Sequence, residues 1–334
     1  MKKQTLLSLI IAIATTMTLN AQTIALHSST GVQIFKGNTA LVDAYTASQS
    51  GDTLYLSGHS FTPPNPFDKQ LMIFGAGHYV DSTLATGKTF INGNVLLSEN
   101  ADQFYIEGVE ITGGFEIANN HSVNYVTIKR CKINGLFRVP GNMSTPSTNL
   151  SLIGNVFVNA VYLYNAQNVI LSNSIVQGNV AYNSGCLITN NIILFGPAYA
   201  LHDISNSQIN NNIFIGTGLS NGVGNTYTNN LIVDATPIYG TSPTAIGNYV
   251  GVAQADIFVN QTGNAFNYAH DYHLQSPASY LGTDGTEVGI YGGLFPYKEG
   301  AVPLNPHIQL KNIAPTTDAN GDLQIQIQVE AQND

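Results

Sequence analysis

The sequence predicts an all-β solenoid, a single parallel β-helix, and two observations carry that prediction. First, a short phrase recurs seven times between Phe104 and Val233, at a spacing of roughly 17–24 residues, which is the length of one solenoid coil. Second, charged residues make up only 9% of the chain and tryptophan is absent, whereas glycine numbers 32. Helix surfaces are usually rich in Lys, Glu and Arg, so this composition favours turn-rich β-structure.

The seven copies share three structural positions. They read FYIEGVEI, VTIKRCKI, LSLIGNVF, VILSNSIV, CLITNNII, SQINNNIF and NTYTNNLI. Alignment on the sixth residue gives the turn positions Val109, Cys131, Asn155, Ser174, Asn191, Asn212 and Asn230. Three residues earlier lie Ile106, Ile128, Leu152, Leu171, Ile188, Ile209 and Tyr227, and two residues later lie Ile111, Ile133, Phe157, Val176, Ile193, Phe214 and Ile232. Inward apolar residues on both sides of a tight turn are typical of a β-helix rung. Asn at the turn position predicts an internal ladder, in which each amide bonds the coils above and below.

Residues 1–21 have the features of a secretory leader, with two lysines, an apolar run from Leu6 to about Leu19, and a small residue at Ala21. The run is short for a spanning helix and no second one follows it, so we expect no membrane span. No cysteine lies near the predicted cleavage site, which argues against a lipid anchor. We therefore expect an exported bacterial protein that is secreted, periplasmic or displayed on the cell surface.

The net charge restricts the class of partner, and the positions of the two cysteines indicate whether they form a disulfide. The formal net charge is −9 and no basic stripe occurs, so a nucleic-acid partner is excluded. Cys131 holds a turn position and Cys186 lies three coils later, which at ~4.8 Å per coil separates them by on the order of 14 Å. A disulfide cannot span that distance, so we expect two buried free thiols.

The N-terminal part of the chain predicts a helical cap at the entrance to the solenoid. Residues 39–45 have helical spacing after an N-cap threonine, and residues 51–56 form a turn followed by an alternating strand. A solenoid needs such a cap because the apolar end of its first coil would otherwise face water.

A family resemblance rests on this N-terminal cap and on three further sequence segments. The segments are Leu71–Gly77, Asp271–Leu274 with Ser276–Ala278, and Gly289–Gly293. With them, the chain resembles the secreted right-handed parallel β-helix superfamily, which includes pectate, alginate and chondroitin lyases and many adhesin-like surface proteins. The resemblance implies a right-handed solenoid over residues 22–295, closed at its exit by the last two segments.

Residues 296–334 predict a linker followed by a β-hairpin. Three prolines mark the linker, and the strands are His307–Ile313 and Leu323–Val329 around a turn at 318–321. The second strand alternates strictly, with Leu323, Ile325, Ile327 and Val329 on one face. A lone hairpin is marginally stable in water, so this apolar face needs a cover.

An outward apolar stripe is also predicted on the solenoid. The residue after each turn position points outward, and in five consecutive copies it is apolar. The stripe residues are Val156, Ile175, Ile192, Ile213 and Leu231. A stacked stripe of this kind marks a covered surface or a binding site. Either a long loop of the same chain hides it, or the C-terminal hairpin or another protein packs there.

The charge-dense stretch from Glu107 to Arg138 contains the candidate catalytic residues. They are Glu110, Glu116, Lys132 and Arg138. The resemblance implies uronate lyase chemistry, in which a cationic residue takes the proton beside a carboxylate and calcium held by acidic side chains neutralises that carboxylate. The alternative is structural: opposite charges on adjacent rungs form a cross-strand ladder worth ~0.2–1 kcal/mol.

Aromatic and histidine residues supply further candidates. Tyr162 and Tyr164 share a face two residues apart and could stack on sugar rings. His270 and His273 point to opposite faces of an extended strand, so no shared metal ion is expected.

Three functions remain open from the sequence. The preferred one is an exported, non-catalytic β-helix that binds glycan or another cell-surface component. One alternative is a polysaccharide lyase acting on a uronate polymer. The other is an assembly subunit that docks a protein partner through the apolar stripe or the C-terminal hairpin.

Overall fold

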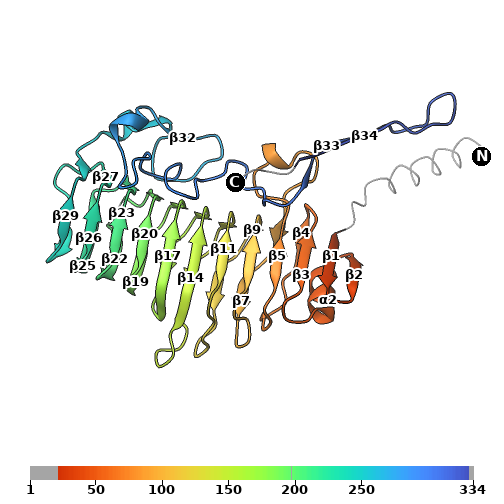
Figure 1. The fold of residues 1–334 in the computed structure, drawn as a ribbon, viewed down its shortest axis with the longest axis horizontal. Helices are drawn as coiled ribbons and strands as arrows, with labels where there is room; N and C mark the ends of the chain where they lie inside the picture. Colours follow the sequence, from red (N-terminus) through yellow and green to blue (C-terminus); the bar gives the residue numbers. More distant parts are fainter. Residues whose placement is uncertain (1–21, 197, 331–334) are drawn as a thin grey trace, which may run out of the picture.

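The fold is a parallel β-solenoid, as the sequence predicts. The computed structural model describes residues 22–196 and 198–330, so the predicted leader at 1–21 lies outside the described residues. Three sheets run along its length, one for each side of the coil (Figure 1). No helix in the described ranges has the length and apolar character that a membrane crossing requires.

The three sheets are named A, B and C in the order in which each coil visits them. Sheet A has 12 strands, β1 (Thr23–Ser28), β2 (Gly31–Lys36), β3 (Thr53–Leu56), β5 (Met72–Phe74), β8 (Tyr105–Glu107), β11 (Thr127–Lys129), β14 (Ser147–Ile153), β17 (Ala166–Ser172), β20 (Leu187–Thr189), β23 (Gln208–Asn210), β26 (Thr226–Thr228) and β29 (Thr244–Ile246). Sheet B has 10, β4 (Ser60–Phe61), β6 (Phe90–Ile91), β9 (Glu110–Ile111), β12 (Lys132–Ile133), β15 (Val156–Phe157), β18 (Ile175–Val176), β21 (Ile192–Ile193), β24 (Ile213–Phe214), β27 (Leu231–Ile232) and β30 (Tyr249–Val250). Sheet C has eight, β7 (Val95–Leu97), β10 (Phe115–Ile117), β13 (Phe137–Arg138), β16 (Val161–Tyr162), β19 (Val180–Ser184), β22 (Tyr199–Ser205), β25 (Gly218–Val223) and β28 (Tyr239–Thr241).

The repeat register predicted from the sequence is confirmed. The residues three before the turn position pair directly between coils in sheet A, and those two after it pair in sheet B. All of them are buried in one continuous core. Helix α2 (Ala40–Ala47) adds Ala40, Leu41 and Ala44 to the same core, next to β1 and β2.

The turn positions form the predicted internal ladder. Each ladder asparagine accepts a hydrogen bond from the backbone N–H of the coil before it, and it donates to a carbonyl of that same preceding coil. Asn212, for example, accepts from the Asn191 N–H at 2.9 Å and donates to the Ile188 carbonyl at 2.8 Å. The ladder runs without a break through Cys131, Asn155, Ser174, Asn191, Asn212, Asn230 and Asn248.

The residue before each ladder position has a left-handed backbone conformation. Its φ is 48° at Asn173, 56° at Asn190, 60° at Asn211 and 51° at Asn229, and Gly108, Gly154 and Gly247 occupy it in other coils. Asn and Gly adopt this conformation at least cost, which explains the Asn–Asn doublets of the sequence. Arg130 holds the same position with a φ of 51°.

Both cysteines are buried free thiols, as predicted. Cys131 and Cys186 are 0% and 3% exposed. Burial raises the pKa of the Cys131 thiol to about 12 and that of Cys186 to about 11. Neither thiol is therefore a reactive thiolate at neutral pH.

The outward apolar stripe is hidden by a long segment of the same chain, which confirms the first of the two interpretations. Residues 257–302, here called the return segment, run back along the outer face of sheet B (Figure 1). The return segment contains β31 (Phe258–Asn260), β32 (Asp271–Leu274) and a short 3₁₀ turn at Pro277–Ser279. A second 3₁₀ turn, Gln254–Asp256, lies just before it, and a third, Asp81–Thr83, lies between β5 and β6. The stripe residues, all 0% exposed, pack against Ile257, Phe258, Tyr272, Leu274, Val288, Ile290 and Tyr297.

The left-handed asparagines hold the return segment in place. Asn173 donates to the carbonyls of Ile290 and Gly292 at 3.0 and 2.8 Å. Asn211 accepts from the Thr283 N–H at 2.9 Å, and its own carbonyl accepts from the Gly289 N–H at 2.7 Å. The segments predicted to close the exit of the solenoid therefore lie along sheet B instead of across its last coil.

The C-terminal hairpin forms but does not cover the stripe, so that interpretation is wrong. Strands β33 (His307–Ile313) and β34 (Ile325–Glu330) pair antiparallel. The hairpin leaves the body near β1, β2 and β5 and extends past the N-terminal end of the solenoid (Figure 1). Its apolar side chains stay in solvent, with Ile325 at 56% and Val329 at 59% exposed.

The ladder yields a first testable prediction. Asn212→Ala should lower the free energy of unfolding by roughly 2–4 kcal/mol, because it leaves the Asn191 N–H and the Ile188 carbonyl buried without that partner. Chemical denaturation of the two proteins measures the difference. Gln208→Ala, which removes an exposed amide from β23 in the same coil, is the matched control and should change stability by less than about 0.5 kcal/mol. Equal losses would show that the ladder adds nothing beyond an ordinary amide.

Candidate functional site

The structure divides the predicted charged cluster between two sheets. Glu110 and Lys132 are register partners on β9 and β12 of sheet B. Glu116 and Arg138 are register partners on β10 and β13 of sheet C. The four side chains therefore form two cross-strand pairs on different faces of the coil and do not make one site.

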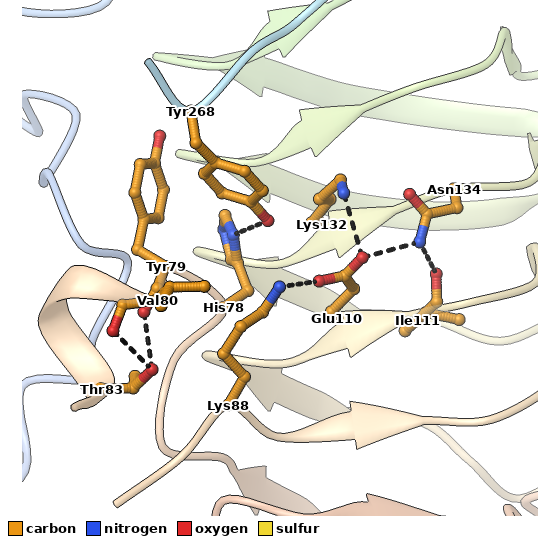
Figure 2. A network of polar contacts seen from close by, with 10 residues as sticks. All are labelled: His78, Tyr79, Val80, Thr83, Lys88, Glu110, Ile111, Lys132, Asn134 and Tyr268. Carbon is orange, nitrogen blue, oxygen red and sulfur yellow. Dashed lines mark hydrogen bonds and ion pairs between the residues drawn. The ribbon is translucent and has the colours of Figure 1, made fainter. Parts of the chain in front are cut away.

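The pair on sheet B belongs to a larger buried network. Glu110 accepts from Lys132 Nζ at 3.0 Å and from Asn134 Nδ2 at 3.0 Å through one oxygen, and its other oxygen contacts Lys88 Nζ at 2.6 Å. Figure 2 shows Tyr268 of the return segment lying over this group, with both ammonium groups 5.1 Å from its ring centroid. Its hydroxyl is hydrogen-bonded to His78 Nδ1 at 3.2 Å.

The ionisation of this network follows from its burial and its charges. Burial raises the pKa of Glu110, but hydrogen bonds from Lys88, Asn134 and Lys132 outweigh that effect and lower it to about 2. Burial lowers the pKa of His78 to about 3, so the imidazole is neutral at physiological pH. Burial also raises the pKa of Tyr268. Two ammonium groups, one carboxylate and a neutral aromatic lid fix the return segment to the solenoid.

The acidic side chains of this region do not fit the calcium site that the family resemblance implies. Glu107 contacts Arg130 at 2.6 Å, Glu110 binds two lysines, and Glu116 contacts Arg138 at 2.6 Å. Within 22–196 and 198–330, no group of three or more His, Cys, Asp or Glu side chains is placed to hold a metal ion.

The two histidines of the return segment have separate partners. His273 stacks on Tyr291, with ring centroids 3.9 Å apart, and contacts Asp271 at 2.8 Å. His270 instead lies 3.4 Å from the Tyr272 hydroxyl.

The outer face of sheet C is open and carries an aromatic cluster. Tyr164 and Tyr182 stack with centroids 4.5 Å apart at an interplanar angle of 11°. Tyr162 meets both rings edge-on, at 5.7 and 5.3 Å. His202 packs against Tyr182 at 5.4 Å and Tyr199 lies beyond it at 6.4 Å. These five rings, here called the aromatic row, come from three successive coils.

A groove of mixed polar and apolar lining continues the aromatic row toward the N-terminal end. Its volume is about 630 Å³, and its polar lining includes Asn65, Asn92, Asn94, Glu116 and Arg138. Arg138 is the register partner of Tyr162, so the groove and the row share one strip of sheet C. The sequence predicted Tyr162 and Tyr164, but it missed His202 and the groove, in which Glu116 and Arg138 of β10 and β13 meet asparagines from the neighbouring corners.

Backbone strain accompanies the aromatic row. Tyr182 has a φ of 64° although it lies inside β19, and Asp203, next to His202, has a φ of 50°. A bulky aromatic residue in this region is an outlier that costs of order 1–3 kcal/mol, and such outliers cluster at functional sites. In β19 the left-handed conformation accompanies the stacking of Tyr182 on Tyr164.

Comparison of the chain with protein-family models, with curated proteins and with solved structures found no match.

The neutral buried imidazole of His78 yields a prediction about pH. The unfolded chain takes up a proton at His78 below pH 6.5, whereas the folded protein takes it up only near pH 3, so stability falls as the pH drops through 6.5. Between about pH 7.5 and about pH 5 this group should cost about 2 kcal/mol of unfolding free energy. His78→Gln should flatten the pH dependence by that amount, as measured by denaturation at both pH values. His27→Gln, at an exposed site, is the matched control and should keep the wild-type slope.

The charge balance of the same network gives an asymmetric prediction. Glu110→Gln leaves the nearly buried Lys88 and Lys132 facing one another, which should cost about 3–5 kcal/mol of unfolding free energy. Lys88→Met should cost less, because the Glu110–Lys132 pair survives it. Denaturation midpoints compare the variants, and protease cleavage within residues 262–270 reports whether Tyr268 has been released. A larger loss for Lys88→Met would contradict this account.

Proposed function

We propose that the protein is an exported, non-catalytic β-helix that binds a neutral polysaccharide chain along the outer face of sheet C. The observation that carries the proposal is the aromatic row, which shares one strip of sheet C with a groove lined by both polar and apolar side chains. Aromatic rings offer large apolar faces with polar edges, and binding sites combine such surfaces with a few placed polar groups. Export rests on the leader predicted at residues 1–21.

The repeat of the solenoid suits a polymer. Successive coils place equivalent outward positions ~4.8 Å apart, close to the length of one sugar unit in an extended glycan. The register row on sheet C runs Glu116, Arg138, Tyr162, Ala181 and His202. A linear chain laid along this row would meet hydrogen-bonding groups at one end and ring faces at the other.

The charges of the face favour a neutral ligand over a uronate polymer. Arg138 is the cation in this strip, and Glu116 contacts it at 2.6 Å. The formal net charge of −9 adds a general repulsion toward polyanions. The resemblance to the secreted right-handed β-helix superfamily, with its lyases and adhesins, supports the fold-level analogy, but a fold hosts many functions.

The lyase alternative has less support. Its candidate base, Lys132, is bound to Glu110 and only 14% of its side chain is exposed. Tyr268 covers both residues, so a substrate would first have to displace the return segment (Figure 2).

Binding to a polysaccharide panel tests the proposal. The purified mature chain should bind one or more neutral polymers, such as xylans, β-glucans or mannans, more tightly than alginate or polygalacturonate. Tyr164→Ala and Tyr182→Ala should each raise the dissociation constant roughly tenfold or more, which calorimetry or affinity electrophoresis measures. Tyr125→Ala removes an exposed tyrosine outside the aromatic row and is the matched control.

Each outcome of the panel distinguishes between the proposed functions. Unchanged affinity in both variants of the aromatic row would contradict the placement of the binding site on sheet C. Binding of acidic polymers alone would reject the neutral ligand. New absorbance from an unsaturated product, lost in Lys132→Ala, would establish a lyase in place of a binding protein.

A further inference from the structure

The last coil of the solenoid ends in three uncovered edge strands. β28, β29 and β30 are the terminal strands of sheets C, A and B. Apolar side chains are exposed at each of them, with Ile238 at 58%, Ile246 at 60% and Val250 at 45%. The return segment, which could have closed this end, lies along sheet B. Free edges with apolar side chains are templates for pairing with another chain.

This edge lacks charged protection, although its strands have only two or three residues and Pro237 and Pro243 precede β28 and β29. Proteins blunt exposed edges with charged side chains, with lysine above all. No Asp, Glu, Lys or Arg occurs from 235 to 255, the stretch that contains the whole last coil. An exposed apolar edge without charged side chains is typical of a surface that is covered in an assembly.

The opposite end of the molecule carries a matching edge. β2 is the terminal strand of sheet A there, and Val32 and Ile34 are 57% and 55% exposed. β2 is antiparallel to β1, which is antiparallel to β3, and the later strands of sheet A are parallel to β3. β2 therefore runs in the same direction as β29. Translation along the solenoid axis brings the two free edges together in the parallel sense that sheet A already uses.

The C-terminal hairpin is placed to reinforce such a contact. One face of the hairpin carries the exposed apolar residues Ile308, Ile313, Ile325, Ile327 and Val329, together with Lys311, the register partner of Ile327. Pro303, at its base, packs on Gly108 at the corner between sheets A and B, and the hairpin then projects past β1 and β2 (Figure 1). The same corner of a second copy, stacked on this end, presents Ile246 and Val250.

We propose that the protein associates head to tail with further copies of itself. The last coil of one copy meets β2 and the C-terminal hairpin of the next, so that sheet A continues from molecule to molecule. Such a contact joins two different surfaces and does not close on itself, so it generates linear oligomers instead of a symmetric dimer. This inference does not rest on the proposed glycan function, because it uses neither the aromatic row nor the groove.

Sedimentation velocity and electron microscopy of the mature chain over a range of concentrations test the proposal. The wild type should form linear oligomers that lengthen with concentration. Ile246→Lys blocks the tail and Ile34→Lys blocks the head, and each should raise the dissociation constant roughly tenfold or more. Ile327→Lys should weaken association through the hairpin. All three side chains are exposed in the monomer, so the fold tolerates the substitutions.

Ile170→Lys is the matched control. It adds the same charge to an exposed position of β17 in the middle of sheet A, and it should assemble like the wild type. The decisive experiment mixes the Ile34→Lys and Ile246→Lys variants. Each keeps one intact end, so the mixture should form a heterodimer and stop there, at concentrations where each variant alone stays monomeric. A wild type that stays monomeric up to its solubility limit, or a closed dimer that both variants leave unchanged, would overturn the proposal.

Discussion

The hydrogen bonds of the ladder at the corner between sheets A and B are the constraint on which the rest of the structure depends. Each coil must turn there with backbone groups that are fully buried, and such groups need partners. Asn155, Asn191, Asn212 and Asn230 supply them, each 0% exposed. Because each amide joins neighbouring coils, it fixes the stacking of the coils as well as the turn. The even spacing of every outer face follows from that stacking.

The Asn–Asn doublets join the corner to the outer face of sheet B. The second residue of each pair enters the ladder, while the first, in a left-handed conformation, binds the return segment at Asn173 of the Asn–Ser pair and at Asn190, Asn211 and Asn229 of the doublets. Gly289 of that segment lies so close to Ile213 that an added Cβ would come within 2.6 Å of its side chain. The outer face of sheet B is therefore covered by the return segment of the same chain. Sheet C keeps its aromatic row exposed, and this difference places the candidate binding face on sheet C.

The sequence predicted the register of the repeating coils and the existence of the N-terminal helix and the C-terminal hairpin, but it missed how the non-repeating segments pack on the solenoid. Inward residues such as Leu171 and Val176 recur at fixed offsets, so their register could be read from the chain alone. The pairing of Glu110 with Lys132 followed from their equivalent positions. Lys88, His78 and Tyr268 lie in segments without a period, so nothing in the repeat aligned them with Glu110. The predicted location of the hairpin was wrong for a related reason. An apolar face indicates that another surface must cover it, but it does not identify that surface.

A solenoid repeats along a single axis. The proposed binding face and the proposed head-to-tail association both run along that axis. Equivalent positions recur at ~4.8 Å along the axis within a molecule, and a head-to-tail contact that continues sheet A would place sheet C of every copy on the same side of the assembly. Tyr162, Tyr182 and His202 of successive copies would then lie along one line. A polymer bound to several copies at once gains avidity without any new contact, because each later binding step is intramolecular. Weak stacking on a single copy is then sufficient for firm attachment to a long glycan, and the uncharged last coil, a liability in a monomer, becomes the joint that makes this possible.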